Sequence, residues 1–166
     1  MAQDYAEGVK WYLLAAEHGR AHVQARLGKI YHEGKGVAQD YAEAAKWFTL
    51  AAQQGDDYAQ YNLGVMFFNG RGVVQDYEAA GKWFRMAAAK GLLDAQFNLG
   101  LMYSEGQGVV QDYGRAHLWF NLASVKGDAT AVRNRDTAAS KMTPQQIGEA
   151  QKLARDCLAR KFKDCD

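Results

Sequence analysis

Residues 59–91 read AQYNLGVMFFNGRGVVQDYEAAGKWFRMAAAKG, and this stretch decides the fold because the chain contains several near-copies of it. An Asp-Tyr pair, a tryptophan, a Leu-Gly pair and a Gly-x-Gly-Val turn all recur at steps of 36 residues. The four tryptophans of the chain are Trp11, Trp47, Trp83 and Trp119. Most of the 17 glycines lie on the same period. Similarity at a fixed period of this length indicates a repeat architecture.

Each repeat is predicted to form two helices. One helix begins at the aspartate of the Asp-Tyr pair, whose carboxylate can accept hydrogen bonds from the first turn. Glu43 follows Asp40 at the spacing of a capping box, and Glu7 follows Asp4 in the same way. Apolar residues then recur every three or four positions until a glycine such as Gly55 ends the helix. The other helix carries an apolar stripe, which in this copy is Ala59, Leu63 and Phe67.

A glycine lies in the middle of this other helix, at Gly64 and its counterparts. Glycine costs about 1 kcal/mol in a helix interior, so its recurrence requires a compensating contact. We expect the neighbouring helix of the pair to approach closely here, with its tryptophan ring against the bare backbone.

The pattern resembles the Sel-one-like repeat (SLR) family, which is related to the tetratricopeptide repeats. The residues that carry the resemblance are Ala59, Leu63, Gly64, Phe67, Gly70, Gly72, Val73, Asp76, Ala80, Trp83, Phe84, Ala87, Ala88 and Gly91, with the same series in the other copies. The resemblance implies an all-α fold, an α/α solenoid in which antiparallel helix pairs form a right-handed superhelix. It also implies that the first helix of each pair lines the concave face.

The repeats are predicted to occupy residues 1–127 as about three and a half units of 36 residues, followed by a C-terminal linker and capping helix over 128–166. The first unit begins at the second helix of a pair. After Gly127 the period fails in a polar stretch, and Thr143 and Pro144 then read as the start of the capping helix. Leu118 replaces the lysine of the other copies, as expected for a position that this cap covers.

Composition and motifs argue against several functions. Twenty basic and 19 acidic residues give a net charge of +1, so nucleic acid is not an expected partner. The chain lacks an apolar segment long enough for membrane insertion. Gly19 separates His18 from His22, so we expect no metal site, and we predict no cofactor and no catalytic residues. The sequence leaves the compartment open between the cytoplasm and, if a signal peptide was removed, the periplasm or the exterior.

The two cysteines, Cys157 and Cys165, leave two alternatives. In one continuous helix they would be about 12 Å apart, which is too far for a disulfide. If the helix ends near Lys161, the tail can fold back and close the bond. Otherwise Cys157 is a buried thiol and Cys165 lies in a disordered tail.

Positions that vary between the copies are free to form a binding site. On the first helix of each pair, the first copy is basic and polar where the next two are aromatic or aliphatic. We therefore predict that a partner peptide or helix binds on the concave face. The predicted contact residues are Tyr58, Tyr61, Phe68, Phe97 and Leu101, with Arg26 and Lys29 as an electropositive end.

These residues have an alternative role. Tyr61, Phe97 and Leu101 can instead pack between successive helices, whereas Phe68 is expected to be exposed because its counterparts are polar. The resemblance implies a non-enzymatic protein-interaction module, an adaptor or scaffold that binds another protein or peptide. The alternatives are a small-molecule-binding or hydrolytic site that forms only in three dimensions, and a structural module that self-associates through its N-terminal half-unit.

Overall fold

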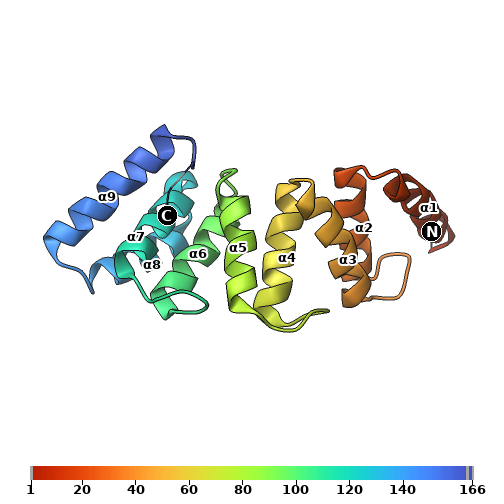
Figure 1. Ribbon diagram of the computed structural model, residues 1–166, viewed down its shortest axis with the longest axis horizontal. Helices are drawn as coiled ribbons and strands as arrows, with labels where there is room; N and C mark the ends of the chain where they lie inside the picture. The colour runs from red at the N-terminus through yellow and green to blue at the C-terminus, as the bar shows by residue number, and fades with distance from the viewer. Residues whose placement is uncertain (1, 164, 166) are drawn as a thin grey trace. The chain divides into compact units, whose positions relative to one another are not determined.

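The computed structural model describes residues 2–163 and 165, with side chains from Glu7 onward. This part of the chain is all-helical (Figure 1). Its α-helices are α1 (Ala2–Glu17), α2 (Ala21–Glu33), α3 (Tyr41–Gln53), α4 (Asp57–Asn69), α5 (Tyr77–Ala88), α6 (Leu93–Glu105), α7 (Tyr113–Ala123), α8 (Ala129–Ala139) and α9 (Pro144–Ala159). A 3₁₀ turn, η1 (Ser124–Lys126), follows α7.

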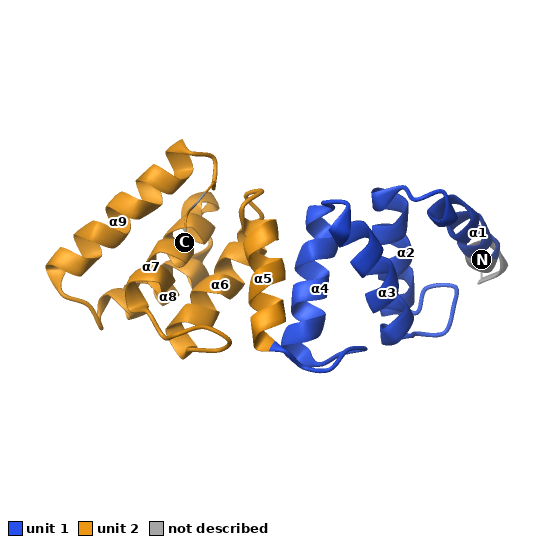
Figure 2. Ribbon diagram, viewed as in Figure 1, with its two compact units in different colours: residues 1–76 blue, residues 77–166 orange. Residues whose placement is uncertain are grey.

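The helices form two compact units, residues 1–76 and 77–166 (Figure 2). In the first unit, α1 packs on α2, α2 on α3 and α3 on α4. In the second unit, α5 packs on α6, α6 on α7, and α7 on both α8 and α9. The predicted all-α architecture of sequential helix pairs is therefore confirmed, and the right-handed superhelix stays a prediction.

The helix boundaries follow the predicted punctuation, with one exception. The Asp40 carboxylate accepts hydrogen bonds from the backbone N–H groups of Ala42 and Glu43, so Asp40 caps α3 as expected. The other half of the predicted capping box does not form, because the Asp40 N–H donates to the Tyr31 carbonyl. The carboxylate of Glu43 pairs with Lys46. Helix α1 begins at Ala2, so the prediction of a start at Asp4 is wrong, and the Asp4 side chain lies outside the described residues.

Two of the mid-helix glycines, Gly28 and Gly100, lie against a phenylalanine ring of the next helix. A Cβ atom on Gly28 would lie 2.8 Å from Cδ1 of Phe48, and one on Gly100 would lie 2.6 Å from Cδ1 of Phe120. The close approach is confirmed, but the expectation of a tryptophan ring is wrong. Trp47 precedes Phe48 and therefore points about 100° around the helix, where it packs against the apolar cluster of α1 and α2.

The expected polar linker contains a helix. Helix α8 begins 36 residues after α6, and the Asp128 carboxylate caps it by accepting from the N–H groups of Thr130 and Ala131. Arg135 and Asp136 occupy the positions that hold Leu-Gly in the other copies. The apolar stripe is thereby interrupted, which is why the pattern failed to indicate a helix.

The C-terminal capping helix, α9, begins where the sequence predicts. Thr143 caps α9 through a capping box, Pro144 is its first residue, and Leu118 is buried in α7, which α9 packs against. The chain turns back after Ala159, and a disulfide joins Cys157 to Cys165 with their Cα atoms 5.2 Å apart. Of the two alternatives for the cysteines, a disulfide closed by a folded-back tail or two separate thiols, the structure shows the disulfide.

Candidate partner-binding surface

The predicted contact residues are divided between the two units. The first unit holds Arg26 and Lys29 on α2, and Tyr58, Tyr61 and Phe68 on α4; the second holds Phe97 and Leu101 on α6. Within the first unit, the structure brings the basic residues of α2 next to aromatic rings of α1 and α4.

Lys29 of α2 contacts Tyr58 of α4. The Lys29 ammonium lies 5.7 Å from the centroid of the Tyr58 ring, within the range of a cation–π interaction. The other side of this contact is fixed by Phe48, whose buried ring meets Tyr58 edge to face at 6.1 Å. Tyr58 is nevertheless 40% exposed, so a partner can reach an aromatic ring that the core holds in place.

Arg26 and Lys29 also border a groove of about 330 Å³ between α1 and α2, which we call the α1–α2 groove. Its lining is apolar at Val9, Tyr12 and Ile30 and charged at Arg26, Lys29, Glu33 and Lys35. The Arg26 guanidinium lies 5.4 Å from the centroid of the Tyr12 ring.

The groove carries excess positive charge. Lys35 pairs with Glu33 at 2.7 Å, and its hydrogen bond is the main reason that the pKa of Glu33 is lowered. One carboxylate against three cations leaves a net positive rim around apolar residues. The arrangement suits an acidic side chain next to an apolar one.

The remaining predicted residues are half-buried. Phe97 packs against the buried ring of Phe120 with their centroids 5.6 Å apart, so it contributes to helix packing in the second unit. Phe97 also borders a cavity of about 550 Å³ beside α8. Tyr61, Phe68 and Leu101 are half-buried as well, so Phe68 is less exposed than expected.

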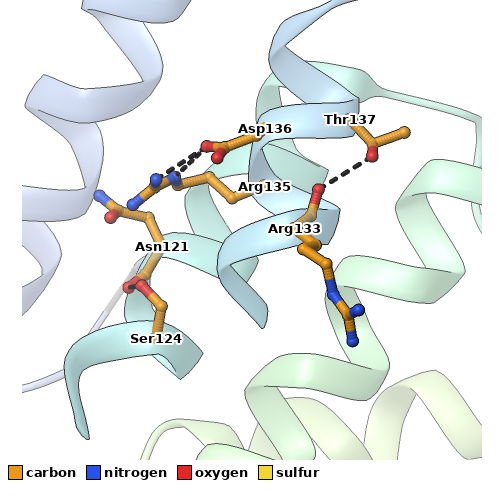
Figure 3. Close-up of polar contacts among 6 residues, drawn as sticks. All are labelled: Asn121, Ser124, Arg133, Arg135, Asp136 and Thr137. Carbon is orange, nitrogen blue, oxygen red and sulfur yellow. Dashed lines mark hydrogen bonds and ion pairs between the residues drawn. The ribbon is translucent and has the colours of Figure 1, made fainter. Parts of the chain in front are cut away.

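A polar cluster around His117 was not predicted. His117 is buried, with 2% of its surface exposed, and it borders a cavity of about 360 Å³ together with Asn121, Arg135, Asp136 and Arg155. The Nε and one terminal nitrogen of Arg135 donate to Asp136 Oδ1 at 2.9 and 2.7 Å (Figure 3). Self-comparison could have found the cluster, because the position of His117 is Val9, Ala45 and Gly81 in the other copies.

The surroundings of His117 lower the pKa of its imidazole. Burial lowers its pKa most, the positive charge of Arg135 lowers it further, and Asp136 opposes both. Its Nδ1 atom is buried with no hydrogen-bond partner among the described residues. Over the same residues, no group of three or more His, Cys, Asp or Glu side chains is arranged to hold a metal ion.

Comparisons with known proteins agree with the resemblance. The Sel1 repeat matches residues 1–19, 21–56, 57–92 and 93–128. A search of curated proteins finds no match. None of the helices described here is long and apolar enough to cross a membrane.

Two solved structures are similar to the chain. The first is a protective antigen of uropathogenic Escherichia coli that displays an SLR fold, with 35% identity and a TM-score of 0.85 over 95% of this chain and 34% of that one. The second is a Sel1 repeat protein of Oxalobacter formigenes, with 36% identity and a TM-score of 0.72 over 76% of this chain and 52% of that one. The chain thus spans about a third and about half of these proteins.

Proposed function

Because the chain belongs to the Sel1 repeat family, we propose that it is a non-enzymatic adaptor or scaffold that binds a peptide or helix of a partner protein. The observation that carries this proposal is the row of aromatic rings and cations in the first unit. Tyr12 with Arg26 and Tyr58 with Lys29 place apolar surface and positive charge side by side. This surface fits a peptide in which an acidic residue flanks an apolar anchor.

The charges should contribute mainly to selectivity. Lys29 keeps about half of its side-chain surface exposed although it lies 3.8 Å from Glu33, so water screens its pairing. An incoming carboxylate can therefore compete for the ammonium group. Tyr58 would supply most of the affinity, because a rigid aromatic ring loses little entropy on binding.

The half-buried residues extend the proposed surface. Tyr61 and Phe68 lie on the same helix as Tyr58; on α6, Phe97 corresponds to Tyr61 and Leu101 to Val65. We include them as residues that a peptide would contact on the first helix of a pair, within each unit.

A random-peptide display selection on the immobilised chain tests the function. We expect enrichment of peptides that combine an acidic residue with an aromatic or aliphatic anchor. The affinity of one selected peptide is then measured against Tyr58→Ala and Lys29→Glu, each of which should weaken binding at least tenfold. Lys152→Glu on α9 is the matched charge reversal and should leave binding unchanged. Failure to enrich any peptide, or equal binding by all variants, would refute the proposal.

The disulfide supports a location outside the cytosol, because such bonds persist in oxidising compartments. The test is thiol alkylation of the protein isolated from its natural source without reductant. Two labelled cysteines would contradict this location, and two unlabelled ones would support it.

The His117 cavity favours one second candidate, the binding of a small acidic molecule. Two arginines and a buried imidazole border it, although Arg135 is already paired with Asp136. Calorimetric titration with small mono- and dicarboxylates tests this candidate. Binding that Arg155→Ala abolishes would support it, and the absence of heat would exclude it for these ligands.

A further inference from the structure

Two arginines of the second unit lie against one buried tyrosine. The guanidinium carbon of Arg115, on α7, is 5.4 Å from the centroid of the Tyr103 ring, and that of Arg85, on α5, is 6.0 Å from it. Arg85 also donates a hydrogen bond to the Tyr103 hydroxyl at 3.1 Å. Only 2% of Tyr103 is exposed, so the core of the second unit fixes the ring that both cations contact (Figure 2).

The repeat itself does not require either arginine. In the other copies, the corresponding residues are Leu13, Thr49 and Asn121 for Arg85, and Glu7, Glu43 and Ala79 for Arg115. Two of the three counterparts of Arg115 are acidic, so the charge at this position is reversed on α7. The fold of a repeat therefore does not depend on these cations, which favours a role in binding.

The two arginines and Tyr103 line a common cavity of about 440 Å³ beside the loop that joins α6 to α7. The apolar part of its lining comes from Val109 and Val110 of this loop, and Val110 is 87% exposed. A cavity of this size can hold an anionic group together with a small apolar substituent.

The loop that borders the cavity is fixed to both neighbouring helices. The Asp112 N–H donates to the Tyr103 carbonyl at 2.9 Å, which ties the end of the loop to α6. At Gly108, where φ is 67°, a Cβ atom would lie 2.5 Å from the carbonyl carbon of Tyr77, so the loop backbone packs directly on the start of α5. The cavity wall is therefore formed before a ligand arrives, which reduces the ordering cost of binding.

The cavity carries excess positive charge. Asp112 is the one carboxylate among its lining residues, and its Oδ2 atom lies 3.8 Å from Nε of Arg115. Both of these side chains are about half exposed, so water screens their pairing and an incoming anion can compete for Arg115. A guanidinium group carries five N–H donors, so the bond to Tyr103 does not exhaust Arg85.

We propose that this cavity, which we call the Arg85–Arg115 site, binds a phosphate monoester with an apolar substituent. One guanidinium fork already matches the two oxygens of a carboxylate. Two guanidinium groups on different helices suit a phosphate group, which has three terminal oxygens and a charge of about −2. The substituent would lie against Val110.

The site is independent of the function proposed above. It shares no residue with the aromatic and basic surface of the first unit or with the His117 cavity. Each proposal can therefore fail without the other.

Calorimetric titration of the full chain with phenyl phosphate tests the inference. We expect saturable binding, and benzoate should bind at least about tenfold more weakly. Arg115→Glu, which restores the charge of two other copies, should weaken phenyl phosphate binding at least about tenfold, and Arg85→Gln should have a similar effect. Arg155→Gln on α9, which removes an arginine that borders the His117 cavity instead, is the matched control and should leave binding unchanged. Arg115 is an exposed residue, so its variant tests the site even if circular dichroism shows that Arg85→Gln unfolds.

A capped pentapeptide with a central phosphotyrosine between glycines distinguishes two sources of the phosphate. If Arg115→Glu weakens binding of both probes, tighter binding of the peptide would assign the site to a phosphorylated side chain. Tighter binding of phenyl phosphate would assign it to a small molecule. Either result supports the site.

Three results would overturn the inference. The first is the absence of binding by phenyl phosphate and the phosphotyrosine peptide. The second is equal affinity for benzoate and phenyl phosphate, because the site would then not select phosphate. The third is binding that Arg155→Gln abolishes and Arg115→Glu leaves intact, which would place the anion in the His117 cavity.

Discussion

Helices α1 and α7 hold the same place in the repeat, yet their environments are opposite. Trp11 of α1 is 68% exposed, whereas Trp119 of α7 is 3% exposed. Leu14 and Leu122, at another shared position, differ in the same way. The difference arises from the neighbours, because α7 packs against α6, α8 and α9 whereas α1 packs against α2.

The comparison shows that the period determines which positions are helical, whereas the neighbouring helices determine which side chains are buried. At the covered end, Leu118 and His117 replace a lysine and a small residue, and both side chains are buried. On α1, by contrast, Trp11 is exposed, while Tyr12 is half-buried against the apolar cluster of α1 and α2. Helices at the same place in the repeat therefore differ in the surroundings of their side chains.

Removing the tryptophan at each end should give the largest contrast. Trp119→Ala should lower the free energy of unfolding by about 3–5 kcal/mol, because it leaves a cavity in a packed region. Trp11→Ala should change it by less than about 1 kcal/mol, as exposed substitutions do. Urea unfolding followed by circular dichroism measures both. Equal losses would mean that α1 is covered in solution.

The disulfide after α9 should give the next largest change in the free energy of unfolding. Cys165→Ser should destabilise the second unit by about 2 kcal/mol, because the bond closes a short loop that restricts the unfolded chain. The tail also seats Phe162 against Gly91, where a Cβ atom would lie 2.9 Å from the ring. Unfolding of the wild type with reductant should match the variant without it. A variant as stable as the oxidised wild type would show that the tail contributes nothing.

Much of the fold was predictable because aspartates and glycines mark the helix ends in each repeat. Asp40 caps α3, and Gly34 ends α2 in a left-handed conformation with φ 68°. Helix α8 was missed because Arg135 and Asp136 interrupt its apolar stripe, so only its neighbours reveal it as a member of a pair. The ring at the mid-helix glycine was assigned to tryptophan because spacing alone does not show which of two adjacent rings faces the neighbour.

The candidate surface was less predictable. Self-comparison pointed to Lys29 and Tyr58, but their contact depends on how α2 and α4 are placed by α3, which a single sequence does not show. The role of Tyr12 was hidden for a different reason. Its period groups it with Phe48 and Phe120, whose rings lie on glycines, whereas the described contacts place it beside Arg26 and the apolar cluster of α1 and α2.

Substitution of one glycine in α6 and one in α1 should change stability by smaller amounts and in opposite directions. Gly100→Ala should cost about 1–2 kcal/mol, because the new Cβ atom would meet the Phe120 ring at 2.6 Å. Gly8→Ala should instead stabilise α1 by up to about 1 kcal/mol, because a Cβ atom there has no neighbour within 4 Å. Thermal unfolding of both variants measures the effect, and a loss on Gly8→Ala would indicate that something occupies the groove.

The smallest effect concerns how stability depends on pH at the covered end. Burial and Arg135 lower the pKa of His117 in the folded chain, whereas the unfolded chain titrates near pH 6.5. As the pH falls below that value, the unfolded state takes up a proton that the folded state resists, so His117 makes the free energy of unfolding decrease. Above pH 7 both states are neutral and the contribution is complete.

His117→Gln tests this dependence, because glutamine keeps a polar group at the site and does not titrate. Between pH 7.5 and 5.5, the free energy of unfolding should decrease less steeply in the variant than in the wild type. His22→Gln, at an exposed position on α2, is the control for replacing a histidine by glutamine elsewhere in the chain. Parallel profiles for wild type and His117→Gln would mean that the imidazole is solvated, with a partner for Nδ1 that restores its ordinary titration.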